Sequence, residues 1–290
     1  MKITTATGWI AALLLAGPVA AGLPGVPETQ LAQAPVPAPA APMYRATGEQ
    51  YRVYEFPGTG EPIPYRLFVP ETWRPGARLP VLVTLRAGTS INNNHRGGNE
   101  LVKLARERGY ILISPLGYRG YAQPYYGSRY PVDREGGPSV PADGWTAQDD
   151  QRAELDVLFV LNLVAAEYGA DTSRLSLHGQ NPSGSAAFHF AAKYPGLFGR
   201  IVVSAGPIVT AGYPFEKLAG RTAVLLLAGD KDAAWTLAAS ERLAGELRTN
   251  GVEAEFHRVA GGEHLNAYLV HAPGLFDFLD RPMLGPARVW

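Results

Sequence analysis

Residues 174–195 constrain the fold more than any other stretch of the sequence. Leu175 and Leu177 alternate with polar residues, which is the pattern of a buried strand, and this pattern ends at Gly179. An alanine-rich run of mostly small residues follows and ends before Pro195, which is typical of a helix. The stretch therefore predicts a strand, a tight glycine turn and a helix in direct succession.

Strands and helices alternate along the rest of the chain. Strand patterns occupy residues 51–56, 63–69, 79–85, 110–114, 200–204, 222–227 and 253–259. Helical patterns occupy residues 99–108, 154–168 and 237–250, and a final short helix begins at 275. Gly58 and Gly60 mark a turn between the first two strands, which predicts an antiparallel hairpin. The alternation of the other elements predicts an α/β fold, with a mostly parallel sheet and helices on both faces.

The turn at Gly179 has the spacing of the nucleophile elbow, G-x-S-x-G, in which a strained turn lifts a serine above an α/β sheet. The serine position, however, holds Asn181. The next residue is Pro182, and Ser183 takes the place of the second glycine. The sequence thus keeps the spacing of this motif without its serine.

Two loops downstream carry a carboxylate and a histidine after the last two predicted strands. Residues 228–232 end in Asp232, and the glycine-rich turn 259–264 ends in His264. In folds with a nucleophile elbow the chain order is nucleophile, acid, histidine, each after a strand. Asp232 would accept the imidazole N–H and fix its tautomer, although its place before a helix also suits a turn or cap residue. A core role is predicted for His178, which lies within the elbow strand.

Taken together, residues 51 to about 280 resemble the α/β-hydrolase superfamily, in particular bacterial secreted esterases of the feruloyl-esterase, polyhydroxybutyrate-depolymerase and prolyl-oligopeptidase-like group. The resemblance implies an α/β-hydrolase fold and a carboxylic ester hydrolase of the serine esterase type. It assigns the nucleophile position to Asn181, the catalytic acid to Asp232 by the G-x-x-D pattern, and the catalytic histidine to His264.

The active centre departs from this family in three places. The amide of Asn181 cannot be activated to an alkoxide by an imidazole. The oxyanion hole of the fold uses the backbone N–H of the residue after the nucleophile, and Pro182 has none. The second oxyanion donor comes from an H-G-G-type loop after the third strand, where this sequence has Arg86, Ala87 and Gly88. These departures predict lost or altered ester hydrolysis.

Three hypotheses for the function remain open. The first is an exported protein of the serine-esterase type with lost or altered hydrolysis, in which Asp232 and His264 persist or act as a general base without a covalent intermediate. The second is an active esterase in which Ser183, followed by the N–H of Gly184, is a displaced nucleophile helped by the helix dipole. The third is a non-catalytic binding protein for a sugar, a phenolic compound or a polyester fragment.

A tyrosine-rich stretch at residues 118–130 follows a predicted strand and carries five tyrosines. A loop in this place overhangs the carboxyl edge of the sheet, where ligands bind in open α/β folds. Tyr121, Tyr125 and Tyr126 are candidate binding residues, because their rings combine an apolar face with a polar tip. The alternative is a packed lid whose rings cover the core.

Composition excludes several classes of function. Lys plus Arg and Asp plus Glu each number 26, so no net field draws the chain to nucleic acid or to an anionic membrane. The chain has no cysteine, which excludes disulfides, thiolate metal sites and a cysteine nucleophile. Dinucleotide and phosphate-loop patterns are also missing from the sequence. We expect no nucleic-acid partner, no cofactor and no metal, and a small-molecule or polymer ligand that is ester-like or carbohydrate-like.

Residues 1–21 have the features of a secretory signal peptide. Lys2 supplies the positive end, residues 9–16 the short apolar core, and residues 19–21 the small side chains of a cleavage site. The apolar core is too short to span a bilayer. The sequence therefore predicts export to the periplasm or the cell exterior.

The expected domain organisation follows from composition. Residues 22–49 are rich in Pro and Ala and predict an extended linker without a fold of its own. Residues 50–283 contain all the strand and helix patterns and form one α/β domain, and residues 284–290 form a C-terminal tail.

Overall fold

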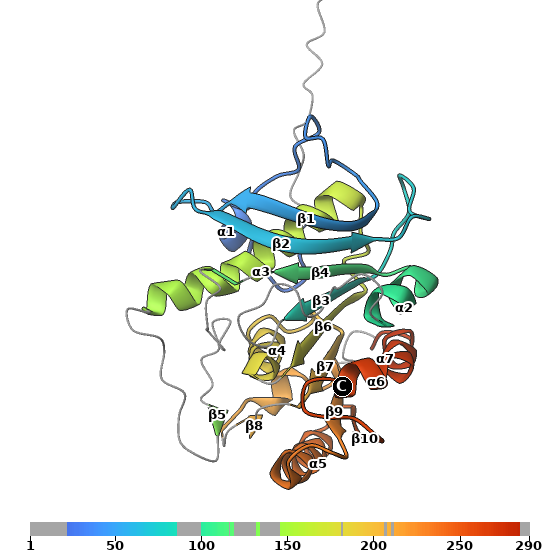
Figure 1. The fold of residues 1–290 in the computed structure, drawn as a ribbon. Helices are drawn as coiled ribbons and strands as arrows, with labels where there is room; N and C mark the ends of the chain where they lie inside the picture. Colours follow the sequence, from blue (N-terminus) through green and yellow to red (C-terminus); the bar gives the residue numbers. More distant parts are fainter. Residues whose placement is uncertain are drawn as a thin grey trace, which may run out of the picture.

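The computed structural model describes residues 22–85, 100–115, 117–118, 132–133, 146–180, 182–205, 208–209 and 212–284. An eight-stranded sheet runs through the molecule in the order β1-β2-β4-β3-β6-β7-β9-β10 (Figure 1). Its strands are β1 (Gly48–Glu55), β2 (Pro62–Val69), β3 (Val81–Leu85), β4 (Ile111–Pro115), β6 (Leu175–Gln180), β7 (Arg200–Ser204), β9 (Ala223–Gly229) and β10 (Ala254–Val259). A separate two-stranded pair joins β5 (Val132–Asp133) and β8 (Ile208–Val209).

The sheet is antiparallel at one end and parallel elsewhere. β1 pairs with β2 and β2 with β4 in antiparallel register. The neighbours from β4 through β3, β6, β7 and β9 to β10 all pair in parallel. The carboxyl ends of these strands therefore share one edge of the sheet, which is where ligands bind in such folds. The predicted fold class is confirmed, including the antiparallel hairpin.

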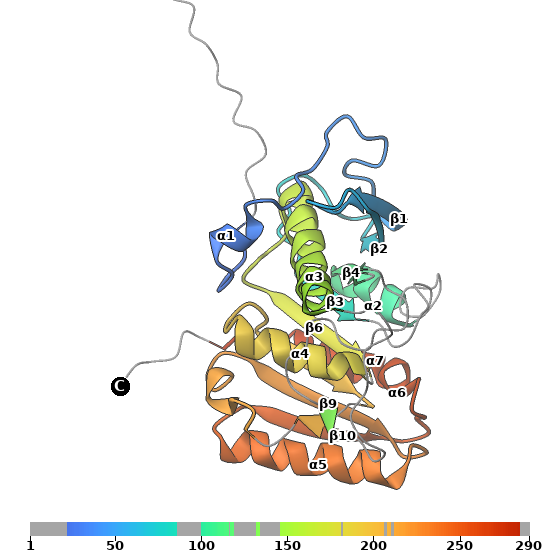
Figure 2. The same ribbon diagram turned by 90° about the vertical axis from the view of Figure 1, so that its left-hand side faces the viewer.

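Helices cover both faces of the sheet, as the strand–helix alternation predicts. They are α1 (Glu28–Leu31), α2 (Glu100–Arg108), α3 (Ala147–Tyr168), α4 (Pro182–Lys193), α5 (Ala234–Thr249), α6 (Ala267–Val270) and α7 (Ala272–Leu279), with the 3-10 helix η1 (Phe215–Lys217) before β9. α1, α3, α4 and α5 contribute to the hydrophobic cluster on one face, and α2, α6 and α7 to the cluster on the other (Figure 2).

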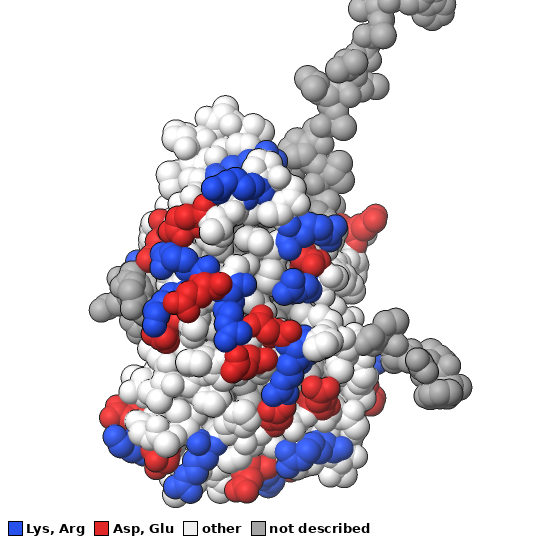
Figure 3. Space-filling model, turned by 90° about the vertical axis from the view of Figure 1, so that its right-hand side faces the viewer, with Lys and Arg blue, Asp and Glu red and all other residues white. Residues whose placement is uncertain are grey.

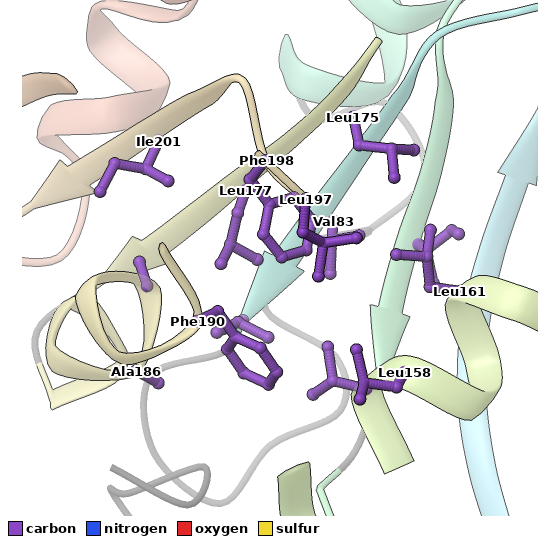
Figure 4. Packing of buried hydrophobic residues seen from close by; sticks show 14 of the residues in the cluster. Val83, Leu158, Leu161, Leu175, Leu177, Ala186, Phe190, Leu197, Phe198 and Ile201 are labelled. Atoms are coloured by element: carbon purple, nitrogen blue, oxygen red, sulfur yellow. The ribbon is translucent and has the colours of Figure 1, made fainter. Parts of the chain in front are cut away.

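The core on the α3–α4 face fixes the strand that leads into the elbow turn. Leu175 and Leu177 of β6 are fully buried and point toward the helices (Figure 4). Phe190 of α4 and Leu158 of α3 fill the space opposite them. Burying side chains of this size contributes about 1.5–3 kcal/mol each. This packing against α3 and α4 therefore holds the end of β6 in place.

The segment before β1 differs from the structureless linker expected for residues 22–49. Leu23, Val26 and Leu31 are buried, and α1 contacts α3. Apolar residues are sparse among the Pro and Ala of this segment, but these three dock on the domain. Burial of a few side chains thus outweighs the extended tendency that the composition indicates.

A buried polar cluster holds the end of this N-terminal segment. Glu167 accepts the backbone N–H of Arg45 at 2.6 Å and Arg52 Nη1 at 2.8 Å. The Tyr168 hydroxyl donates to the carbonyl of Ala46 at 2.7 Å. The side chains of Arg52 and Glu167 are only 8% and 4% exposed. A buried ion pair needs its remaining polar atoms satisfied, and here the backbone of the N-terminal segment supplies partners.

Helix boundaries were less predictable than helix positions. α3 begins at Ala147, well before the predicted start at 154. Its first turns are polar and carry no apolar period, but Thr146 and Asp149 form a capping box in which each side chain accepts the other's backbone N–H. α5 begins at Ala234 instead of 237, and the four-residue α6 was not predicted.

Acidic and basic side chains are interspersed on the face shown in Figure 3. Arg108 pairs with Asp277 at 2.8 Å and with Asp280 at 2.6 Å, and Arg106 pairs with Glu71 at 3.1 Å. This mixture agrees with the balanced charge of the sequence. In the part of the chain that the structure describes, no helix is both long and apolar enough to cross a membrane.

Candidate active site

The turn between β6 and α4 is as tight as the sequence predicts. β6 ends at Gln180 and α4 begins at Pro182, so only position 181 separates them. A Cβ atom added to Gly179 would overlap the carbonyl oxygen of Ser183. Only glycine fits there, because the strand end and the first turn of the helix are in backbone contact. Pro182 suits the first position of α4, because a backbone N–H at this position would have no hydrogen-bond acceptor within the helix.

Several predicted site residues lie outside the described residues. They are Asn181, Arg86, Ala87, Gly88, Tyr121, Tyr125 and Tyr126. Their assignments therefore stay predictions from the sequence.

Ser183, the alternative nucleophile, lies in the first turn of α4 and has no exposed surface. Its carbonyl oxygen is the atom in contact with Gly179. A nucleophile has to reach a substrate carbonyl at the surface of the site. With this helix start, the Ser183 hydroxyl is covered instead of presented.

Asp232 and His264 come together at the carboxyl edge of the sheet. His264 Nδ1 lies 3.0 Å from each carboxylate oxygen of Asp232. A carboxylate only accepts hydrogen bonds, so Nδ1 carries the proton and Nε2 is left as an acceptor. The Asp232 side chain is 3% exposed and that of His264 is 34% exposed. The carboxylate is thus buried behind an imidazole that reaches solvent.

Backbone contact between the two loops produces this pair. A Cβ atom on Gly229, the last residue of β9, would overlap the carbonyl oxygen of Gly262. The Lys231 N–H donates to that same oxygen at 3.0 Å. The Asp230 carboxylate accepts the Gly261 N–H at 2.8 Å. The acid loop and the histidine loop are therefore held together by contacts of their backbones, in addition to the hydrogen bond between Asp232 and His264.

A further contact ties the histidine loop to the elbow. Gln180 Nε2 donates to the carbonyl of His264 at 3.3 Å. Gln180 is the last residue of β6, directly before position 181. The three parts of the predicted site thus lie together at one edge. Sequence reasoning missed this contact, because a glutamine at a strand end gives no signal of its partner.

His178 has the predicted core role. It is fully buried, its Nε2 lies 2.9 Å from the Ser204 hydroxyl, and its ring lies 4.7 Å from that of Tyr268. Burial lowers the pKa of His178 to about 3, so the ring is neutral at physiological pH. It does not belong to the Asp232–His264 pair.

A second histidine forms a separate buried ionic cluster. His189 Nε2 lies 2.6 Å from Glu154, which also accepts Lys193 Nζ at 2.5 Å and lies 2.5 Å from the Tyr194 hydroxyl. Burial alone would raise the pKa of Glu154, but these hydrogen bonds outweigh it and hold that pKa at about 2. The cluster links α3 to α4, which lie on the same face of the sheet.

The described start of the tyrosine-rich stretch is packed. Tyr118 is 1% exposed, and its ring lies 4.8 Å from that of Phe56. Beside it, the buried carboxylate of Asp156 accepts the Gly117 N–H at 2.7 Å and the Tyr54 hydroxyl at 2.6 Å. The first tyrosine of the stretch therefore covers the core, as the packed-lid alternative expects for it.

With this geometry in place, comparison with known proteins decides the family. The model of a family described as "Putative esterase" matches residues 57–236, which include the elbow turn and Asp232. The chain belongs to this esterase family. No curated protein matches its sequence.

Solved structures similar to this esterase-family chain share its fold. The BES protein from Bacillus cereus superposes with a TM-score of 0.58 at 14% identity, covering 82% of this chain and 97% of that one. S-formylglutathione hydrolase from Staphylococcus aureus gives 0.57 at 14% identity, covering 80% and 98%. The fluorophosphonate-binding serine hydrolase F of Staphylococcus aureus gives 0.59 at 12% identity, covering 81% and 99%. At such identities the likeness concerns the fold.

Proposed function

We propose that this protein is an exported member of the esterase family that does not form an acyl-enzyme and instead binds an ester-like small molecule or polymer fragment beside Asp232 and His264. The observation that carries the proposal is the formed pair, with Nδ1 3.0 Å from both carboxylate oxygens, next to an elbow that has Asn181 in place of serine. The acid and the histidine of a catalytic triad are therefore present, but position 181 has no serine hydroxyl to attack a substrate.

The chemistry of such a site follows from its groups. In the neutral imidazole of His264, Nε2 can accept a hydrogen bond or a proton from a bound hydroxyl or water, and Asp232 stabilises the resulting imidazolium. The Asn181 amide is a donor that suits a ligand carbonyl, but it is no nucleophile. Pro182 leaves the fold's usual oxyanion donor missing, so a tetrahedral anion would be poorly stabilised. Binding, with at most slow general-base hydrolysis, is the behaviour these residues support.

The alternative is an active esterase that uses Ser183. Its burial in the first turn of α4 speaks against this, because the hydroxyl would need the helix start to unwind. The hydroxyl would also have to approach His264, whose imidazole lies at the solvent-exposed side of Asp232.

Labelling with a fluorescent fluorophosphonate separates the two possibilities. We expect wild-type protein to remain unlabelled and to turn over p-nitrophenyl acetate no faster than its His264→Ala variant. Labelling that is lost in Ser183→Ala would establish the displaced nucleophile and overturn the proposal. Export is tested independently by the mass of the mature protein, which we expect to lack residues 1–21.

A further inference from the structure

A groove separates the segment before β1 from the outer edge of that strand. β1 is the end strand of the sheet, opposite to β10 and the His264 loop that follows it, and the segment before β1 loops beyond it (Figure 1). The groove has a volume of about 550 Å³ and is lined by residues 35–38 and 41–44 of this segment and by residues 51–55 of β1. It is therefore a hollow of the molecule apart from the Asp232–His264 pair.

The backbone of β1 faces β2 and the groove in alternation. The Phe56 N–H donates to the carbonyl of Glu61 at 2.8 Å, so the backbone groups of residue 56 point toward β2. Residues that bond the neighbouring strand alternate along an antiparallel pair with residues that do not, and the register of β1 with β2 is unbroken. The N–H and C=O groups of Tyr51, Val53 and Glu55 therefore point away from β2. Within the described residues, no other segment forms a hydrogen bond with these backbone groups.

The segment on the other side of the groove does not complete this ladder. It contains Pro35, Pro37 and Pro42, which have no backbone N–H to donate. Proline and covering loops protect the edges of natural sheets against pairing with another sheet. Because the loop closes the far side, the groove admits a single added strand and keeps out the whole sheet of a second copy.

Apolar side chains gather at this groove. Seven large hydrophobic side chains of the described residues are exposed, and four of them line the groove. These four are Val36, Met43, Tyr51 and Val53, with exposed fractions between 43% and 57%. Exposed apolar residues that cluster in a hollow mark a site of interaction. Tyr51 and Val53 stand on the face of β1 where they would meet the side chains of an added strand.

The charges of the groove favour a basic side chain at one position. Arg52 and Glu167 pair at 2.8 Å and are almost buried, so they neutralise each other. Glu55 is exposed at one end of the strand edge, and the guanidinium of Arg66 lies 5.8 Å from the centre of the Tyr51 ring at the other. A cationic side chain of an added strand would thus be stabilised beside Glu55 and repelled beside Tyr51.

We propose that the free edge of β1 binds a short extended peptide as a ninth strand of the sheet, with apolar side chains beside Tyr51 and Val53 and a Lys or Arg beside Glu55. The outward backbone groups recur at every second residue, about 6.8 Å apart, which is the period of an extended peptide. In strand addition of this kind, main-chain hydrogen bonds give affinity and alternate side chains give specificity. This inference goes beyond the proposed function and does not depend on it.

Binding of a synthetic peptide to the full chain tests this edge. The probe is acetylated and amidated Lys-Thr-Val-Thr-Ile, whose first, third and fifth residues lie opposite Glu55, Val53 and Tyr51 in antiparallel register. N-methylation of its central valine removes a donor to β1 and should raise the dissociation constant, measured by calorimetry, about tenfold or more. N-methylation of its second threonine is the matched control, because that N–H points away from β1. Glutamate in place of its lysine should weaken binding about two- to fivefold.

Val53→Pro supplies the corresponding change in the protein. It removes an N–H that faces the groove and breaks no hydrogen bond to β2, so the edge strand should tolerate it. We expect it to weaken binding of the peptide at least about tenfold, whereas Val53→Thr should bind like the wild type. Hydrogen exchange at the N–H groups of Tyr51, Val53 and Glu55 should slow when the peptide binds. Thermal melting shows that each variant is folded, and if Val53→Pro is not, the two N-methylated peptides decide.

Each outcome decides the inference. It is overturned if the peptide does not bind, if the two N-methylated peptides bind equally well, or if folded Val53→Pro binds as tightly as Val53→Thr. A free protein that sediments as a dimer and dissociates in Val53→Pro would also overturn it, because a second copy would then cover the edge. Binding that is unchanged in His264→Ala supports a separate site, and a loss there would count against it. The proposed function can therefore fail without affecting this result.

Discussion

At the scale of single residues, position 182 limits what a serine at position 181 can restore. Asn181→Ser supplies the missing hydroxyl, but proline still provides no N–H for the oxyanion. We expect this variant to hydrolyse p-nitrophenyl acetate only weakly. Asn181→Ser combined with Pro182→Ala should be about 100- to 1000-fold faster, because alanine returns one oxyanion donor. Release of p-nitrophenolate measures both rates.

The control for this pair is His264→Ala in the background of the double variant. It should bring the rate back to that of the wild type, since serine needs the imidazole as its base. Equal rates for the single and double variants would show that the proline is not what limits catalysis.

The contact between Gly229 and Gly262 gives a second prediction at this scale. Gly229→Ala places a Cβ atom on the Gly262 carbonyl and should lower the free energy of unfolding by about 1–3 kcal/mol or more. Gly245→Ala is the matched control. Gly245 lies within α5 with open space around its missing Cβ, so alanine should stabilise by about 0.5–1 kcal/mol. Urea unfolding measures both, and two changes of the same sign would contradict the account.

Some of these residue contacts could be predicted and others could not. The chain order and loop context led to Asp232 and His264, and the structure brings these two into hydrogen-bond contact. The overlap of Gly229 with Gly262 could not be foreseen, because a glycine in the sequence does not reveal which atom it approaches. The contact of Gln180 with the histidine loop had no local pattern either.

At the scale of secondary-structure elements, Asp156 links α3 to β1 and to the start of the stretch after β4. Burial raises its pKa to about 6, although hydrogen bonds from Tyr54 and Gly117 oppose the rise. A carboxyl whose folded pKa exceeds its unfolded value of about 3.9 binds its proton more tightly in the folded state. Its stabilising contribution is therefore full below about pH 4 and is lost as the pH rises through 6.

When the pH is lowered from 7 to 4.5, we expect the free energy of unfolding of the wild type to rise by on the order of 1–3 kcal/mol relative to that of Asp156→Asn. Glu154, whose pKa is held at about 2, contributes stability above pH 4.5 and loses it only at lower pH, so it does not mask this window. Urea unfolding at several pH values measures the difference. A difference that does not depend on pH, or that grows as the pH rises, would contradict the assignment.

Periodicity located most elements, because their apolar residues face one core. The alternation of Leu175 and Leu177 placed β6, and the almost wholly apolar run 154–168 placed most of α3. The first turns of α3 escaped detection, since they are polar and are started by the Thr146 cap. α6 has only four residues, which is too short for a helical period.

At the scale of the whole molecule, the segment before β1 is part of the folded unit. A chain that begins at residue 48 should be less stable than one that begins at residue 22, by about 1–3 kcal/mol for each buried group that loses its partner. Glu167 would lose the Arg45 N–H, and Tyr168 would lose the Ala46 carbonyl. Thermal and urea unfolding compare the two chains. Equal stability would favour the linker that the composition predicts.

The central claim is that the protein keeps Asp232 and His264 but cannot form an acyl-enzyme at its elbow. The most direct test is the mass of the intact protein after incubation with excess p-nitrophenyl acetate and an acid quench. A serine esterase would hold an acetyl group at its elbow during turnover. We predict that the wild type keeps its mass, whereas the variant with Asn181→Ser and Pro182→Ala gains an acetyl adduct. An adduct on the wild type that maps to residues 179–184 would contradict this account.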